Sequence, residues 1–434
     1  MKVLHINTLE RGGAARGCIN LHLGLLQENV KSKVLFLDYL GNVPESENYW
    51  SFHKDEVFSL LQKRPIYAKI KDKLFTFLGI SKFSQELKHK AVMKVISKKR
   101  DKKYEVFTSS LSLNQITEHP AYKEADIIHL HWVNNFLDYE EFFTNNSKPI
   151  FWTLHDMFPM TGGCSFSMEC RQFEIKCTFC PQLIKAGYPE YVEKLFDYKY
   201  QNLKNNKTSI TIITPSRWMG ENSRKSKLLK TFPHYVISNG IETEFFHIKQ
   251  RYSAKANLNI AENDIIVLFV ADHIDNQRKG THFIFPVVEE LSKQTGLKNL
   301  LFVTVGAGEL QLNARHKHLG LINNLEKMAQ IYAAADVFIC PSIQDNFPNT
   351  ILESLLVGTP VIGFPSGGIP EMIEEGKSGF IAPDLSEQSL YETILKWYSQ
   401  KDILSNLEIA NKALANYKLE VQAKAVLELY RKVN

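Results

Sequence analysis

The sequence predicts an α/β protein with two doubly wound parallel sheets, each in its own domain. Three observations predict this class. The 434 residues are enough for two domains that each bury a core. Short apolar runs that suit buried parallel strands are followed by glycine-containing turns and helical patterns. This alternation starts at the N-terminus and starts again at residue 264. We expect a first domain of residues 1–245 with a crossover helix of about 416–434, and a second domain of residues 246–415.

The composition is that of an ordinary soluble protein. Apolar residues make up 44% and charged residues 23% of the chain, and the net charge is +5. No run reaches the roughly 18 apolar residues of a membrane span. The first residues, Met1 to Asn7, have the pattern of a strand and not of a signal peptide. We therefore predict a cytoplasmic protein.

An insertion at about residues 51–104 is strongly basic. Between Lys54 and Tyr104 it holds 15 Lys or Arg and 5 Asp or Glu, with apolar residues at helical spacing. Two interpretations stay open: a basic amphipathic surface that meets anionic lipid, peripheral to the inner face of the membrane, or a solvated helical insertion packed by its apolar side. Nucleic-acid binding is not expected.

The first strand, residues 2–7, is followed by a loop with Gly12 and Gly13 and then by a helix from about residue 15 to 27. Two glycines at this place let a ligand approach the backbone, although a tight turn explains them equally well. Further strands are expected at residues 33–37, 104–108, 126–130, 149–154 and 209–214.

Polar residues follow two of these strands. His131 comes after residues 126–130, and His155 and Asp156 come after residues 149–154. Open α/β sheets bind ligands at the carboxyl ends of their strands. The alternation of a strand places His129 and His131 on one face. A structural histidine is the alternative for His131.

Four cysteines, Cys164, Cys170, Cys177 and Cys180, lie close together in the sequence. Only the last pair has the C-x-x-C spacing of a zinc site, so structural zinc, disulfides and reduced, packed thiols all stay open. Four thiolates would leave a zinc ion no open position. No catalytic metal is therefore expected from this cluster.

The stretch of residues 335–371 contains the densest pattern. It predicts a strand at 335–340, a helix capped by Asn346 and ended by Gly358, a strand at 359–363, and a Gly367-Gly368 turn into a second helix at 369–371. Two helix N-termini at one sheet edge would attract phosphate.

Charged residues complete this pattern. Asp345 and Glu353 are suited to accept hydrogen bonds from sugar and ribose hydroxyls. Arg278 and Lys279, just before Gly280, suit a diphosphate. Together these residues predict a nucleotide-sugar site.

These motifs resemble those of a known family. The run D-N-F-P-N-T-I-L-E, followed by G-T-P-V and G-G-x-x-E, resembles the donor-binding signature of retaining GT-B glycosyltransferases of family GT4 (group 1). The run G-G-A-x-R resembles the opening of the same family. The runs D-N-F-P-N-T-I-L-E and T-L-H-D-M-F-P-x-T-G-G-C are similar to bacterial surface-polysaccharide members, which make capsule, exopolysaccharide, lipopolysaccharide or O-antigen. Asp345 stands where many members have Glu, and Ala271-Asp272 where many have a further Arg. The resemblance covers nearly all of the chain except the basic insertion.

The resemblance implies a GT-B fold, with two facing Rossmann-like domains and a cleft between them. It implies a retaining enzyme that moves a hexosyl unit from a UDP- or GDP-sugar to a growing, lipid-linked surface glycan. The alternatives are an epimerase or phosphorylase of the same fold, or a nucleotide-sugar-binding subunit without turnover.

The resemblance also assigns roles to residues. The implied catalytic residues are His155, Arg278, Lys279 and Asp345. The implied donor-binding residues are Gly12, Gly13, Lys279, Asp345, Asn349, Thr350, Glu353 and Gly368. The implied acceptor-side residues are His131, Asp156, Gly162 and Gly163.

Overall fold

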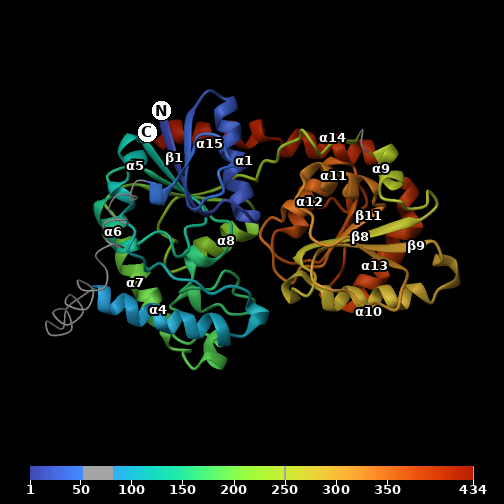
Figure 1. Cartoon of the computed structure of the whole chain (residues 1–434), viewed down its shortest axis with the longest axis horizontal. Coiled ribbons are helices and arrows are strands. Elements are labelled where there is room, and N and C mark those ends of the chain that lie inside the picture. Colours follow the sequence, from blue (N-terminus) through green and yellow to red (C-terminus); the bar gives the residue numbers. More distant parts are fainter. Residues whose placement is uncertain (52–81, 249–250, 434) are drawn as a thin grey trace. The chain divides into compact units, whose positions relative to one another are not determined.

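The structure, a computed structural model, describes residues 1–51, 82–248 and 251–433 (Figure 1). It contains two compact units. Unit 1 comprises Met1–Thr214, Gly220–Tyr235 and Leu429–Asn434, and unit 2 comprises Pro215–Met219 and Val236–Glu428. The contacts therefore divide the chain after Tyr235, where the sequence pattern places a boundary after residue 245. Residues 52–81 of the basic insertion lie outside the described residues.

Unit 1 is built on a sheet with the strand order β3-β2-β1-β4-β5-β6-β7 in the described part of the chain. The strands are β1 (Lys2–Leu9), β2 (Lys31–Asp38), β3 (Ser46–Asn48), β4 (Ile127–Leu130), β5 (Ile150–Thr153), β6 (Ile210–Thr214) and β7 (His234–Val236). The helices are α1 (Gly13–Gln27), α4 (Lys82–Lys99), α5 (Pro120–Glu124), α6 (Tyr139–Asn145), α7 (Tyr191–Asn205) and α8 (Arg217–Lys225), of which Arg217–Met219 belong to unit 2. The central strands β1, β4 and β5 pair in parallel and are almost wholly buried, as their apolar sequences require.

Unit 2 is built on a second parallel sheet with the order β10-β9-β8-β11-β12-β13. The strands are β8 (Ile265–His273), β9 (Leu300–Ala307), β10 (His316–His318), β11 (Val337–Cys340), β12 (Val361–Gly363) and β13 (Gly379–Ile381). The helices are α9 (Arg251–Asn257), α10 (Thr281–Ser292), α11 (Leu325–Ala334), α12 (Asn349–Leu356), α13 (Glu387–Gln400), α14 (Asn406–Tyr417) and α15 (Leu419–Val433), whose end from Leu429 belongs to unit 1. Apolar clusters lie on both faces of this sheet, which explains why its strands read as continuous apolar runs.

Each sheet reverses its winding at one place. In unit 1 the chain runs from β1 outward through β2 and β3 and then returns to β4, on the other side of β1. In unit 2 it runs from β8 through β9 and β10 and returns to β11, on the other side of β8. The loops after β1 and β4, and after β8 and β11, therefore diverge and leave room for a ligand. Both units are Rossmann-like, as predicted.

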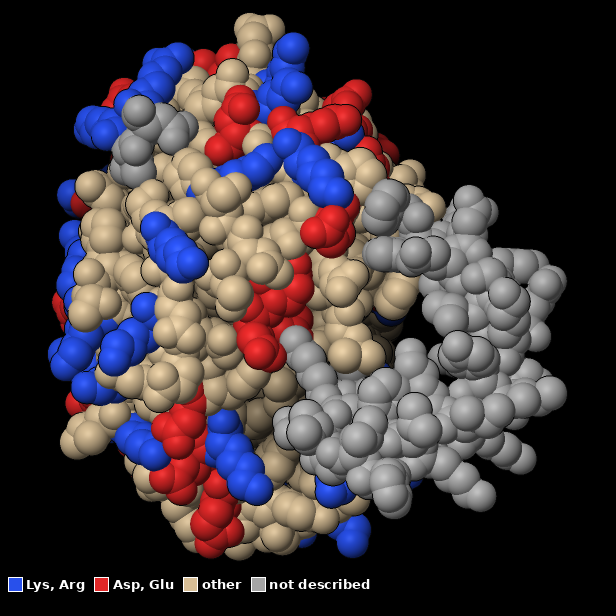
Figure 2. Space-filling view, turned by 90° about the vertical axis from the view of Figure 1, so that its left-hand side faces the viewer, with Lys and Arg blue, Asp and Glu red and all other residues tan. Residues whose placement is uncertain are grey.

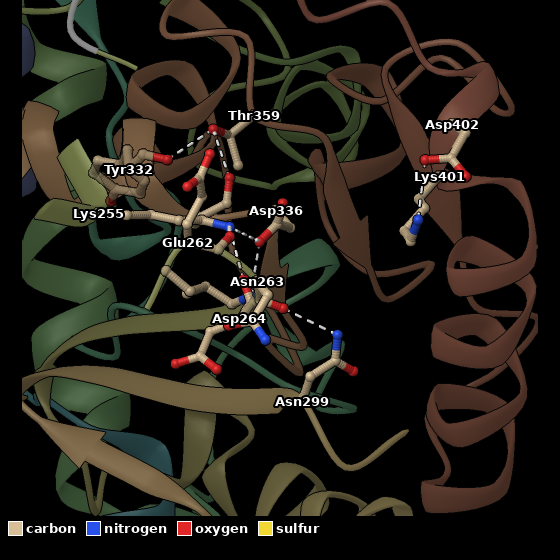
Figure 3. Close-up of polar contacts among 12 residues, drawn as sticks. Lys255, Glu262, Asn263, Asp264, Asn299, Tyr332, Asp336, Thr359, Lys401 and Asp402 are labelled. Atoms are coloured by element: carbon tan, nitrogen blue, oxygen red, sulfur yellow. Dashed lines mark hydrogen bonds and ion pairs between the residues drawn. The ribbon is translucent and has the colours of Figure 1, made fainter. Parts of the chain in front are cut away.

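A polar network holds the opposite, amino edge of the unit 2 sheet (Figure 3). Lys255 Nζ donates to the carbonyl of Asp264 (2.7 Å) and to Asp336 Oδ2 (3.1 Å), and the same oxygen accepts the N–H of Ile266 (2.8 Å). Asp336 precedes β11 and Ile266 lies in β8, so one carboxylate ties the two strands that flank the reversal. This network therefore links β8 and β11 at the edge opposite the site.

The secondary structure differs from the expected one at four places. Residues 104–108 form no strand, because only Phe107 makes an isolated bridge, to Cys164. Residues 369–371 form a single 3₁₀ turn, and α12 begins after Pro348 instead of at an Asn346 cap. The expected last helix of residues 402–433 is interrupted at Lys418, which has extended backbone. Gly358 ends α12 with φ +84°, as predicted.

The described part of the basic insertion is α4, which packs by one face. His89 and Ile96 are buried, and His89 Nδ1 lies 2.7 Å from the hydroxyl of Tyr191. The exposed lysines of this helix are Lys88, Lys90, Lys94, Lys98 and Lys99. Figure 2 shows that basic and acidic side chains intermingle on the face that it displays. Within the described residues, no helix combines the length and the apolar character that a membrane crossing needs.

Candidate functional site

The charged residues predicted to bind the donor meet at the reversal of the unit 2 sheet. Arg278 and Lys279 follow β8, and Asp345 follows β11. Arg278 Nη1 lies 3.0 Å and Lys279 Nζ 2.7 Å from Asp345 Oδ2. The structure therefore brings Asp345 to two cations that precede it in the sequence by 67 and 66 positions.

The three side chains differ in exposure, and therefore in how readily a ligand can reach them. Arg278 is buried and also donates to the carbonyl of Gln344 (2.7 Å), so it fixes the loop after β11. The side chain of Lys279 is 20% exposed and is the more accessible cation. Lys279 and Arg278 hold the pKa of the buried Asp345 carboxyl well below its usual range, against the opposing effect of its burial. The cluster carries two cations and one anion, so it keeps one net positive charge for an anionic ligand.

Close backbone packing makes glycine necessary around this cluster. A Cβ on Gly280, which has φ +81°, would lie 2.0 Å from the carbonyl oxygen of Pro341. A Cβ on Gly367, with φ +58°, would lie 1.8 Å from the carbonyl oxygen of Asp345. The N–H of Gly368 donates to the same oxygen (2.9 Å). The N–H of Gly368 therefore closes the turn, and a contribution of Gly368 to donor binding stays a prediction.

The other predicted donor-binding residues lie on α12. Asn349 and Thr350 are half-buried in its first turn, and Glu353 follows one turn later with 3% of its surface exposed. Pro348 at the N-cap supplies no side-chain acceptor for the N–H groups of the first turn, and its carbonyl accepts the N–H of Ile351 (3.0 Å). These groups and Asn349 lie just after Asp345 in the chain.

Ser216 and Glu371 make hydrogen bonds whose partners the sequence did not indicate. Ser216 Oγ donates to Asn346 Oδ1 (2.6 Å), and the Glu371 carboxylate accepts the N–H groups of Arg217 and Trp218 (2.8 Å each). Glu371 thus caps the N-terminus of α8. The G-G-x-x-E pattern pointed to a glutamate at this place but not to its partner.

In unit 1, Gly12 and Gly13 begin α1 at the reversal of the sheet. Gly12 has φ +92°, and a Cβ on either glycine would meet no described atom within 4 Å. These glycines are therefore not imposed by packing, in contrast to Gly280 and Gly367. Nearby, the Glu10 carboxylate accepts the N–H groups of Gly41 (2.9 Å) and Asn42 (2.7 Å) and holds the loop after β2.

Histidines from three adjacent strands meet at the carboxyl edge of the unit 1 sheet. His5 Nδ1 lies 2.9 Å from His131 Nε2, and His131 Nδ1 lies 2.9 Å from His155 Nε2. His5 and His131 are buried, whereas His155 is half-buried. Burial lowers the pKa of His155 to about 4 and lowers the pKa values of His5 and His131 well below 6.5, so all three are neutral at pH 7. Sequence reasoning found His131 and His155 but not His5.

The remaining acceptor-side residues are engaged in structure. Asp156 accepts the indole N–H of Trp132 (2.8 Å) and the N–H of Phe158 (2.9 Å), and burial raises its pKa. A Cβ on Gly162 would lie 2.4 Å from Val192 Cγ2, and one on Gly163 would lie 2.5 Å from Phe107 Cζ. Both glycines are therefore required by packing within unit 1.

The loop with these glycines lies over a buried lysine. Lys199 is fully buried, and its Nζ donates to the carbonyls of Phe158 (2.5 Å) and Thr161 (3.0 Å). Burial lowers its pKa to about 7. Lys199 thus holds the start of the T-G-G-C turn by these two hydrogen bonds. The sequence did not indicate this role.

The four cysteines are free in the structure. Burial raises the pKa values of Cys164, Cys177 and Cys180 to about 12, and the proximity of other cysteines of the cluster acts in the same direction. Among the described residues, three metal-ligand atoms come within 4.8 Å of one another at His5, His129 and His131. Structural zinc at the cysteines stays a prediction.

Comparison with solved structures identifies the class of fold. A sucrose-phosphate synthase from Thermosynechococcus elongatus aligns over 100% of this chain and 99% of its own, with a TM-score of 0.64 and 15% identity. HepE of Anabaena in complex with UDP-glucose aligns over all of both chains, with a TM-score of 0.58 and 16% identity. The chain has the fold class of the GT-B glycosyltransferases.

Sequence comparison narrows this class. Residues 264–400 match the family described as glycosyl transferases group 1. An uncharacterised glycosyltransferase of Methanocaldococcus jannaschii is 25% identical over 45% of this chain and 53% of its own length. A D-inositol 3-phosphate glycosyltransferase of Corynebacterium urealyticum is 35% identical over 24% of this chain and 25% of its own. A protein of Salmonella typhimurium that is named as a putative colanic acid biosynthesis glycosyltransferase is 27% identical over 26% of this chain and 32% of its own length. The chain thus spans about half or less of these relatives, and the matches support a group 1 glycosyltransferase.

Proposed function

We propose that this protein is a retaining glycosyltransferase that moves a hexosyl unit from a UDP- or GDP-sugar to a growing, lipid-linked surface glycan. The observation that carries the proposal is the convergence of Arg278, Lys279 and Asp345 at the reversal of the unit 2 sheet. A diphosphate needs cations held in a fixed position, and a sugar needs carboxylates as hydrogen-bond acceptors. The resemblance to the UDP-glucose complex of HepE supports a nucleotide-sugar donor.

In the proposed reaction, the bond between the anomeric carbon and the diphosphate oxygen breaks, and its electron pair stays on the nucleotide diphosphate. The acceptor hydroxyl oxygen bonds to the anomeric carbon on the same face, and its proton passes to the departing phosphate oxygen. Lys279 stabilises the growing negative charge, and Arg278 holds the loop that positions it. Asp345 and Glu353 accept hydrogen bonds from donor hydroxyls, and His155 contacts the sugar.

The test is transfer of a labelled sugar in the full chain. Lys279→Ala is expected to lower kcat by about 10²–10³, the usual effect of removing one preorganised charge-stabilising donor. Glu353→Ala is expected to abolish transfer of the labelled sugar. The control is Lys293→Ala, because Lys293 is an exposed lysine of the same unit that pairs only with its neighbour Glu290 among the described residues. Normal transfer by both site variants would refute the proposal.

The same assay separates the alternatives. An epimerase would convert the labelled donor without any acceptor, and a phosphorylase would need inorganic phosphate. A silent binding subunit would bind the donor and transfer nothing to any acceptor of the glycan pathway.

We also propose that the protein meets an anionic membrane through α4. Helix α4 carries five exposed lysines and contacts the 3₁₀ helix Pro181–Ala186, where the apolar side chain of Ile184 is 53% exposed. Cations next to an exposed apolar group suit an anionic lipid surface. Sedimentation with phosphatidylglycerol vesicles should capture the protein, and Lys94→Glu with Lys98→Glu should release it. Equal capture by neutral vesicles would contradict this part.

A further inference from the structure

We infer that His5 and His131 are positioning residues that keep the hydrogen of His155 on Nδ1, so that His155 acts as a hydrogen-bond donor and not as a base. The inference deepens the proposed function and rests on it only where it names a sugar hydroxyl as the partner of His155. Its basis is a chain of three neutral imidazoles joined by two hydrogen bonds of 2.9 Å.

The chain has only two consistent arrangements, because each neutral imidazole carries one N–H. In the first, His5 Nδ1 donates to His131 Nε2, and His131 Nδ1 donates to His155 Nε2. In the second, both bonds reverse, and the hydrogen of His5 lies on its Nε2. The two arrangements place the hydrogen of His155 on opposite nitrogens.

The buried end of the chain decides between them. His5 is 0% exposed, and its Nε2 has no hydrogen-bond partner among the described residues. The second arrangement would leave a buried N–H donor there without an acceptor, which costs the full desolvation penalty of that donor. The first leaves only a lone pair, which is less unfavourable. The chain therefore runs from His5 toward His155, and His155 carries its hydrogen on Nδ1.

A metal ion is the competing explanation for three histidines in one place. His5, His129 and His131 have ligand nitrogens within 4.8 Å of one another. However, the rings of His129 and His131 are stacked with centroids 4.4 Å apart and planes 16° apart. Lone pairs of stacked rings lie in parallel planes and do not converge on one ion. His129 is also bonded elsewhere, to Thr153 Oγ1 (2.7 Å) and to the hydroxyl of Tyr430.

The arrangement has a chemical consequence at His155. Its Nε2 accepts from His131, so the other nitrogen, Nδ1, bears a hydrogen. That nitrogen donates to an oxygen such as a hydroxyl of the transferred sugar, and it has no lone pair with which to take up a proton. In the proposed reaction, His155 is therefore not the group that takes up the acceptor's proton.

The test is the tautomer of His155 in the full chain, labelled with ¹⁵N-histidine and observed by long-range ¹H–¹⁵N spectra at pH 7.5. The His155→Asn variant identifies the signals. In the wild type we expect Nδ1 protonated and Nε2 unprotonated. In His131→Leu we expect the hydrogen to move wholly or partly to Nε2, which a free neutral imidazole prefers in water. His131→Asn retains an amide donor in place of Nδ1–H and should keep the wild-type tautomer, as should His129→Asn, which leaves the chain intact.

Two results would overturn the inference: an Nε2–H tautomer of His155 in the wild type, or an unchanged Nδ1–H tautomer in folded His131→Leu. One equivalent of bound metal that is lost in His131→Leu would also overturn it. The spectra need neither donor nor acceptor, so they stand even if the glycosyltransferase proposal fails. In the transfer assay, His155→Asn should retain at least tenfold more kcat/KM than His155→Leu, because only Asn supplies a donor.

Discussion

Acid should destabilise this protein strongly, because four clustered histidines are held neutral. Burial lowers the pKa of His129 to about 3 and that of His155 to about 4, and it lowers those of His5 and His131 well below 6.5. In the unfolded chain all four return to about 6.5. Below this pH the unfolded state binds protons that the folded state does not, so the free energy of unfolding falls as the pH falls.

The size of the effect follows from these values. Between pH 7.5 and 5.5, each histidine that stays neutral in the folded state lowers the free energy of unfolding by about 1.4 kcal/mol. The four together lower it by about 5 kcal/mol, which is comparable to the whole stability of many domains. His22 and His89 act in the same direction. Asp156 and Glu141 have raised pKa values and act in the opposite direction.

The assay is urea unfolding, followed by tryptophan fluorescence, at several pH values in this range. His129→Asn should reduce the loss on acidification by about 1.4 kcal/mol, since one neutral histidine is removed. The exposed His273 is the control, and His273→Gln should keep the wild-type dependence. A stability that is flat between pH 7.5 and 5.5 would show that these histidines are not neutral in the folded protein.

Other variants test the packing of the two sites. Gly280→Ala should destabilise unit 2 by about 1–3 kcal/mol and weaken donor binding, because its Cβ would overlap the Pro341 carbonyl; Gly296→Ala, in open space, should be neutral in the same thermal melt. Glu10→Ala should lose about 1.5–3 kcal/mol, because it removes the buried carboxylate that accepts the N–H groups of Gly41 and Asn42, and the exposed Glu169→Ala should lose nothing. Asp345→Asn should lower stability by about 3–5 kcal/mol by leaving Arg278 without its carboxylate, and a melting temperature equal to that of the wild type would contradict the role given to this ion pair.

The sequence predicted most of the fold because its signals are local. An apolar run such as Val337–Cys340 needs cover on both faces, and Gly358 has the left-handed backbone that ends a helix. The meeting of Lys279 and Asp345 was also predictable, since both follow strands that flank one reversal of a parallel sheet. These features depend on pattern and topology, which the sequence carries directly.

The missed features depend on register and on competition between partners. His5 lies inside an apolar strand, and only its parallel pairing opposite His129 brings it to His131. The sequence pattern suggests that the N–H of Gly368 can bind phosphate, but it does not show that this N–H donates to the carbonyl oxygen of Asp345. The segment of residues 104–108 has the composition of a strand, but within the described residues its one bridge is that between Phe107 and Cys164. A local sequence pattern does not show which distant strand or hydrogen-bond partner a residue will have in the folded protein.

The most direct test of the account is calorimetric titration of the full chain with a panel of UDP- and GDP-sugars. The account predicts that at least one of them binds the wild type and Lys293→Ala with equal affinity. Lys279→Ala should bind the same ligand at least ten times more weakly, because the accessible cation beside Asp345 is gone. Equal binding by all three proteins would place the diphosphate away from Lys279, and failure of every nucleotide-sugar to bind the wild type would contradict the donor site itself.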